Sequence, residues 1–146
     1  MTPKIIFGTA NFGLDLTTSS AVTSVLSLLT SLKISELDSA ARYPPNKPNE
    51  SERLLGETNA AGKGFAVDTK IYTAAGNGSG ELSKEAIESS FKGSLERLGV
   101  DKVNILYCHR SDPTTPIKEQ AAAFNHLFKQ GKFNKVKLLT LIPRND

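Results

Sequence analysis

Short apolar segments alternate with segments of helical periodicity along most of this chain. The predicted strands cover residues 4–8, 34–37, 65–69 and 103–107, and residues 136–142 form a further candidate. Between them, apolar residues recur at the three- and four-residue spacing of a helix. Strands separated by helices normally pair in parallel through right-handed crossovers. The alternation therefore predicts an α/β fold, either part of an eight-stranded barrel or a small open doubly wound sheet.

Capping residues and apolar stripes define the predicted helices. Asn49, followed three residues later by Glu52, resembles a capping box, and Gly56 is a typical stop signal. Thr115 and Pro116 predict the start of the last helix. The apolar stripe expected for that helix consists of Ile117, Ala121, Phe124 and Phe128.

Polar side chains follow three neighbouring predicted strands. Asp38, Lys70 and His109 come at or directly after the ends of these strands, and Tyr43 lies in the loop that begins at Asp38. Folds of this type place their chemistry at the carboxyl ends of parallel strands. We therefore expect an acid, a phenol, an amine and an imidazole at one mouth of the fold.

These four groups suit the transfer of a proton to a carbonyl oxygen. The reference pKa of a tyrosine is about 10, and a nearby ammonium lowers it by favouring the phenolate. A carboxylate beside that ammonium keeps it charged, and an imidazole can orient a carbonyl or relay a proton. None of the four supplies a hydride, so a reduction would need a cofactor.

The bulk composition indicates a single globular domain. The chain has 146 residues, a net charge of +3 and one cysteine, Cys108, which we expect in the core. The charge is too small to predict nucleic-acid binding, and no apolar run approaches the length of a membrane span. A lone cysteine and no apparent signal peptide make a cytoplasmic location the expectation. His126 and the lysines at 129, 132, 135 and 137 are expected on the solvated surface.

Four motifs arrive in order along the chain: residues 8–13 (GTANFG), 37–43 (LDSAARY), 68–70 (DTK) and 106–109 (LYCH). Together they resemble the successive motifs of the aldo-keto reductases. Residues 51–56 and 112–119 look most like the aflatoxin-aldehyde reductase branch and its fungal relatives. The resemblance covers about residues 4–133.

This resemblance implies a (β/α)8 TIM barrel and NADPH-dependent reduction of a small aldehyde or ketone. It assigns the proton donor to Tyr43, the tuning of that donor to Lys70 and Asp38, and the orientation of the substrate carbonyl to His109. It places the cofactor against Gly8, Thr9, Ala10 and Asp38, and it implies no metal. The glycine-rich residues 76–80 lack the spacing of a phosphate-binding motif and predict only a connecting loop.

The sequence also departs from the family pattern. Ser39 stands where the family usually has threonine, and Asn104 stands where it often has aspartate. We expect residues 1–133 to form the N-terminal half of a barrel of four or five βα units, and residues 134–146 to be a divergent tail without the family's nicotinamide-binding Ser-Asn pair.

An open half barrel is expected to expose inward-facing Ile, Val and Leu side chains, at about 25 cal/mol per Å² of apolar surface. The first expectation is reductase activity that is weak or absent, because the family's main adenosine-phosphate contacts are not found in this sequence. The alternatives are a non-catalytic half barrel that dimerises through its open edges, or an unstable truncation product.

Overall fold

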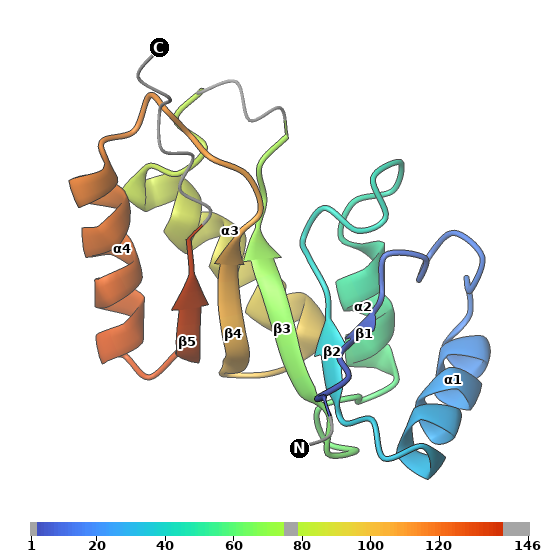
Figure 1. Cartoon of the computed structure of the whole chain (residues 1–146). Coiled ribbons are helices and arrows are strands. Elements are labelled where there is room, and N and C mark those ends of the chain that lie inside the picture. Colours follow the sequence, from blue (N-terminus) through green and yellow to red (C-terminus); the bar gives the residue numbers. More distant parts are fainter. Residues whose placement is uncertain (1–2, 75–78, 139–146) are drawn as a thin grey trace.

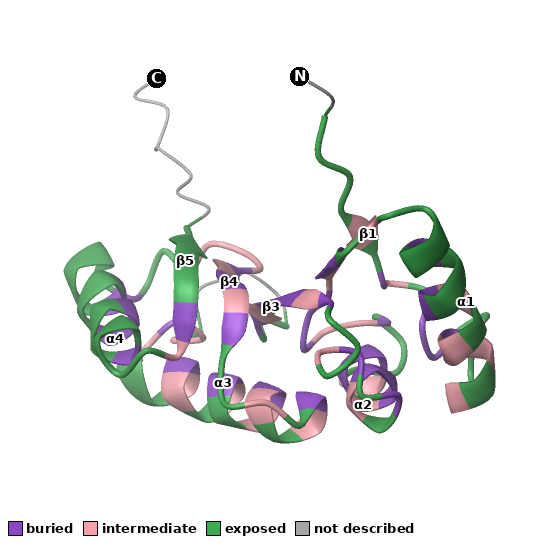
Figure 2. Ribbon diagram, turned by 90° about the horizontal axis from the view of Figure 1, so that it is seen from below, coloured by how far each residue is buried: buried purple, intermediate pink, exposed green. Residues whose placement is uncertain are grey.

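Five parallel strands form one sheet, and they lie in the order in which they occur in the sequence (Figure 1). The computed structural model describes residues 3–74 and 79–138. The sheet runs β1-β2-β3-β4-β5, and all four helices cover the same face of it (Figure 2). A doubly wound sheet reverses its strand order and carries helices on both faces. The arrangement is therefore that of consecutive units of a (β/α)8 barrel, as predicted.

The elements alternate without exception along the described residues. Their bounds are β1 Phe7–Gly8, α1 Ser19–Ser31, β2 Glu36–Asp38, α2 Glu50–Glu57, β3 Ala66–Ile71, α3 Lys84–Leu98, β4 Val103–Cys108, α4 Ile117–Lys129 and β5 Phe133–Lys137. The strand β5 spans the predicted boundary at residue 133. The division of the chain into residues 1–133 and 134–146 stays a prediction. Residues 139–142 of the expected fifth strand, and 76–78 of the glycine-rich loop, lie outside the described residues.

Ordinary capping determines where α1 and α3 begin and end. The Thr18 and Ser83 side chains accept hydrogen bonds from backbone N–H groups in the first turns of α1 and α3. Gly99 ends α3 with φ +66°, a backbone conformation that glycine adopts without steric cost. The apolar stripes of both helices pack against the sheet, where Leu26 and Phe91 are among the largest buried side chains.

The helix α2 differs from the sequence prediction at both ends. Asn49 has φ +73° and forms no side-chain cap, so the predicted capping box is wrong. Glu52 is instead fully buried, and its carboxylate accepts hydrogen bonds from Thr69 on β3 and Arg97 on α3. Gly56 does not stop the helix. It allows close packing, because a Cβ at this position would lie 2.0 Å from the carbonyl oxygen of Arg97.

The buried face of α4 is rotated from the predicted stripe. Ile117 and Phe128 are 55% and 52% exposed, whereas the buried residues are Gln120, Ala123, Phe124 and Leu127. The Gln120 side chain donates to the backbone oxygen atoms of Asp112 and Thr115, which turns this face inward. The Thr115 hydroxyl donates to Asp112 and does not cap the helix, so that prediction is also wrong.

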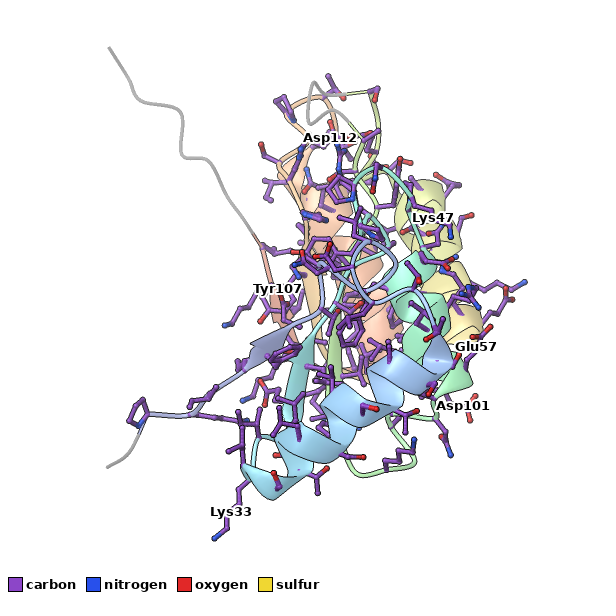
Figure 3. All side chains as sticks on the ribbon, turned by 90° about the vertical axis from the view of Figure 1, so that its right-hand side faces the viewer. Lys33, Lys47, Glu57, Asp101, Tyr107 and Asp112 are labelled. Atoms are coloured by element: carbon purple, nitrogen blue, oxygen red, sulfur yellow. The ribbon has the colours of Figure 1, made fainter. Side chains whose placement is uncertain are left out.

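The face of the sheet opposite the helices is mostly polar. Thr69 contacts α2, so its strand neighbours Asp68 and Lys70 point to the other face. Register places Tyr107 beside Lys70, and Lys137 beside Tyr107, on that same face. Figure 3 shows Tyr107 on the side of the sheet away from the helices. Asp68, Lys70 and Lys137 on that face are charged, and Ile105, two residues before Tyr107 on β4, is 5% exposed. The expected exposure of inward Ile, Val and Leu side chains is therefore not seen at these positions.

No helix among the described residues is long and apolar enough to cross a membrane.

Replacing Gly56 with alanine tests the close contact between α2 and α3. We expect Gly56→Ala to lower the free energy of unfolding by about 1–3 kcal/mol, since the new methyl group meets a backbone oxygen that cannot rotate away. The expectation holds even though alanine is the better helix former by about 1 kcal/mol. Urea denaturation measures the change. Gly8→Ala is the control, because nothing lies within 4 Å of a Cβ there; equal stability of wild type and Gly56→Ala would contradict the packing described.

Candidate active site

The four residues predicted to carry chemistry come from three adjacent strands and one loop. Asp38 is the last residue of β2, Lys70 lies in β3, and His109 directly follows β4. Tyr43 lies in the loop between β2 and α2, where its N–H donates to the oxygen of Ala40 at 3.0 Å. All four therefore lie at the carboxyl end of the sheet. Figure 3 labels Asp112, in the loop after β4, at this end.

Lys70 is at the centre of this group. Its Nζ lies 2.6 Å from Oδ1 of Asp38 and donates to the backbone oxygen of Ser39 at 2.8 Å. The same nitrogen lies 4.7 Å from the centre of the Tyr43 ring. The Lys70 side chain is 12% exposed, so little water screens these interactions. The ammonium is thus held by a carboxylate against the face of the phenol ring.

His109 packs against Tyr43, whose ring the Lys70 ammonium also contacts. The His109 and Tyr43 ring centres are 5.4 Å apart, and the rings meet edge to face at 86°. Burial, together with the nearby charges of Lys70, Arg110 and Arg42, lowers the pKa of His109 to about 4. Its Nδ1 is buried without a hydrogen-bond partner among the described residues. A neutral imidazole therefore faces the mouth, able to donate from one ring nitrogen and to accept at the other.

Three buried hydroxyl groups, those of Thr9, Ser39 and Ser51, form a cluster at the end of β2. Ser51, on α2, lies 2.8 Å from the hydroxyl of Thr9 and 3.2 Å from that of Ser39. The Thr9 hydroxyl also donates to the backbone oxygen of Asp38, and the Ser51 N–H donates to that of Tyr43. Ser39 thus supplies a hydroxyl in place of the family's threonine. The cluster fixes the positions from which the Asp38 and Tyr43 side chains project.

The predicted cofactor residues lie beside this group at the end of β1. Gly8 pairs with Asp38 across the sheet and is exposed, and a Cβ added to it would meet no other atom within 4 Å. Thr9 is fully buried and Ala10 is partly buried. Open space therefore borders Asp38, while the Thr9 side chain is committed to the hydroxyl cluster. Their role in cofactor binding stays a prediction.

The sequence model of the aldo/keto reductase family matches residues 4–138. The chain belongs to the aldo/keto reductase family. An oxidoreductase named sirO from Leptosphaeria maculans is 36% identical over 140 residues, which cover 90% of this chain and 40% of that protein. Aflatoxin B1 aldehyde reductase member 2 from Mus musculus is 31% identical over 137 residues, 93% of this chain and 36% of that protein.

A third relative is a bacterial reductase. L-glyceraldehyde 3-phosphate reductase from Escherichia coli is 35% identical over 122 residues, covering 77% of this chain and 34% of its own length. The predicted resemblance to the aflatoxin-aldehyde reductases and fungal oxidoreductases is confirmed by these relatives. The chain spans about 34–40% of the length of the three relatives described.

The unusual asparagine at position 104 has a clear partner in this aldo/keto reductase chain. Its Nδ2 donates to Oδ1 of Asp68 at 2.8 Å, and the N–H of Ile105 donates to the same oxygen. Asp68 is fully buried, its Oδ2 has no partner among the described residues, and burial raises its pKa to about 6. An aspartate at 104 would place a second acid against this one, whereas the amide supplies a donor. The contact between Asn104 and Asp68 involves none of the four predicted site residues.

Tyr107 is a residue of this mouth that sequence reasoning missed. Its ring lies 5.4 Å from the Nζ atoms of both Lys70 and Lys137. Burial raises the pKa of its phenol, so it stays neutral at physiological pH. The signal that sequence reasoning missed was strand register. Tyr107 lies two residues before His109 and pairs with Lys70 on β3, so both side chains face the same side of the sheet.

The buried, neutral state of His109 is directly measurable. We expect its imidazole to titrate with a midpoint near pH 4 in NMR spectra of the ring protons. This pKa lies below the ordinary value of 6.5, so the imidazole stabilises the fold above pH 6.5 and loses that contribution as the pH falls towards 4. Asp68, whose pKa is raised, changes stability in the opposite direction between about pH 4 and 6. The NMR signal therefore reports His109 more cleanly than unfolding does.

The His126→Gln variant assigns the His109 signal, because the chain has only two histidines. A midpoint near 6.5 for His109 would contradict the buried site described.

Proposed function

We propose that this protein reduces the carbonyl group of small aldehydes or ketones to an alcohol, with NADPH as the hydride donor. The observation that carries the proposal is the position of the Lys70 ammonium, 2.6 Å from Asp38 and 4.7 Å from the Tyr43 ring, with His109 packed on that ring. Two of the relatives described are named as reductases of aldehydes. Family membership and this geometry support the same chemistry.

NADPH would supply a hydride to the carbonyl carbon, and this chain's residues would manage the charge on the oxygen. As the oxygen becomes negative, the Tyr43 hydroxyl donates its proton to it. The Lys70 ammonium stabilises the phenolate that remains, and Asp38 holds that ammonium in place. Neutral His109 orients the carbonyl by a hydrogen bond. Gly8, Thr9, Ala10 and Asp38 would hold the cofactor, and Gly8 leaves open space beside Asp38, since a Cβ there would meet no other atom within 4 Å.

We expect the 146-residue chain alone to be a slow enzyme. It spans about 34–40% of the length of the relatives described, and family resemblance assigns the main adenosine-phosphate contacts to later strands. The preference for NADPH over NADH and the cytoplasmic location remain predictions.

Replacing the proposed proton donor tests the reductase function. We expect the wild-type chain to bind NADPH, seen as a change in cofactor fluorescence, and to oxidise it slowly when an aldehyde is added. Tyr43→Phe should reduce that rate by about 100-fold or more while NADPH still binds, because general acid catalysis contributes about 10²–10⁴ in rate. Lys70→Ala should weaken both binding and turnover.

Tyr72→Phe is the matched control, since Tyr72 is exposed on the loop after β3 and outside the group of four. No NADPH binding by a folded chain, or equal turnover by wild type and Tyr43→Phe, would overturn the proposed function.

A second candidate function is assembly with another polypeptide through the β5 side of the sheet. A groove of about 330 Å³ runs between α4 and β5 and is lined by Phe124, Phe128, Phe133, Val136 and Leu138. Phe128, Val136 and Leu138 are 37–52% exposed. Among the described residues β5 pairs only with β4, which leaves one edge of the strand open. We propose a second copy of this chain as the occupant.

Light scattering coupled to size-exclusion chromatography tests this second function. We expect a dimer that Val136→Glu converts to monomer, because the new charge would be buried in the interface. Leu28→Glu is the matched control, since Leu28 is an exposed leucine on α1, at the other end of the sheet. A folded wild-type monomer at high micromolar concentration would rule out self-assembly.

A further inference from the structure

The four arginines among the described residues fall into two kinds. Arg53 forms ion pairs with Glu50 and Glu57, and Arg97 forms one with buried Glu52. All three ion pairs involve residues of the helices α2 and α3. These two guanidinium groups are neutralised by carboxylates and have an evident structural role.

Arg42 and Arg110 differ from that pattern. Nη1 of Arg42 donates to the backbone oxygen atoms of Thr73 and Ala74, and Nη1 of Arg110 donates to that of Ala74 at 3.1 Å. Neither forms an ion pair with any carboxylate in the described part of the chain. Two guanidinium groups from different loops therefore converge on one carbonyl group.

This convergence lies at the candidate active site. Arg42 precedes Tyr43, and Arg110 follows His109. The charges of both arginines lower the pKa of His109, which shows that they act on its imidazole. Lys70, the third cation, is already paired with Asp38. Arg42 and Arg110 are therefore the positive charges that act on the His109 ring without a carboxylate partner among the described residues.

The acids of the neighbouring loops have other partners. Asp112 is buried and accepts hydrogen bonds from the N–H of Leu82 and the hydroxyl groups of Thr114 and Thr115. Oε1 of Glu81 accepts from the N–H of Ala74. Both guanidinium groups retain Nε and Nη2 donors without a hydrogen bond among the described residues. The N–H donors of a guanidinium group form a planar fork, which binds carboxylate and phosphate groups by paired, charge-assisted hydrogen bonds.

We propose that Arg42 and Arg110 form an anion-binding subsite beside His109 that receives the carboxylate or phosphate group of an acidic aldehyde or ketone. The inference rests on the proposed function for the identity of the reacting carbonyl, but not for the binding of the anion. It names the substrate class as carbonyl compounds with a negatively charged group. Neutral carbonyl compounds of the same length should bind more weakly, because they leave both forks without an anion.

The NMR signals of the arginine side chains can report directly whether an anion binds to them. Malonate and inorganic phosphate are the probes, added to the wild-type chain at constant ionic strength while the Nε–H signals of the arginines are followed by NMR. We expect saturable shifts of Arg42 and Arg110 and none of Arg53 and Arg97, whose carboxylate partners occupy them. Malonamide, the neutral analogue of malonate, should shift none. Absence of shifts at Arg42 and Arg110, or equal shifts at all four, would overturn the proposal.

A pair of variants separates anion binding from a purely structural role. Arg110→Gln should weaken malonate binding by about tenfold or more, since it removes one charged fork. Arg53→Gln, which breaks an ion pair on α2, should leave malonate affinity unchanged. If Arg110→Gln does not fold, Arg110→Lys retains the charge without the fork, and an affinity equal to wild type would count against the subsite.

A last titration distinguishes a substrate anion from the phosphate groups of the cofactor. NADPH is added to the malonate-bound chain. We expect malonate to remain bound and the shifts of Arg42 and Arg110 to persist. Displacement of malonate by NADPH would assign the arginines to the cofactor and overturn the proposal. Malonate binding without any NADPH binding would retain the subsite while contradicting the proposed reductase function.

Discussion

The ion pair between Lys70 and Asp38 joins the ends of two adjacent strands, and the candidate site is arranged around it. The same ammonium binds the Ser39 carbonyl and lies over the Tyr43 ring, so one side chain holds the end of β2 and the loop that carries Tyr43 together. Its low exposure keeps the interaction strong. The pair is possible because both residues point to the sheet face opposite the helices. That face is determined by strand alternation and not by the loops.

The sequence predicted most of the architecture and the four central residues, for local reasons. The helix α3 has an apolar stripe, a serine at its start and a glycine at its end, and all three signals agree. The site residues were found because strand ends are visible as polar residues after apolar runs. Family motifs reinforced both predictions, which is why the parallel order and the Lys70–Asp38–Tyr43 group agree with the structure.

The errors arose where a residue's role depends on a partner far away in the sequence. Gly56 reads locally as a helix stop, but it is required by the Arg97 carbonyl on the next helix. Gln120 lies outside the apolar stripe predicted for α4, but its bonds to the preceding loop make it part of the buried face of that helix. Convergence of Arg42 and Arg110 on Ala74 is equally invisible without the fold, since 68 residues separate them. A local sequence pattern does not show which distant residues come into contact in the fold.

The strictly sequential sheet makes this protein resemble a linear array of βα units. The substantial contacts join an element to its immediate neighbours in the array, as α1 with α2, α2 with α3 and α3 with α4. In such an array each unit is stabilised mainly by the units beside it, and opening begins at the ends. The strands β2, β3 and β4 have a neighbour on both sides, whereas β1 and β5 have one. Asp38, Lys70 and His109 therefore belong to the units whose backbone amides should exchange with solvent most slowly. Fraying at β5 leaves these units paired, whereas fraying at β1 would remove Thr9 from the hydroxyl cluster at the end of β2.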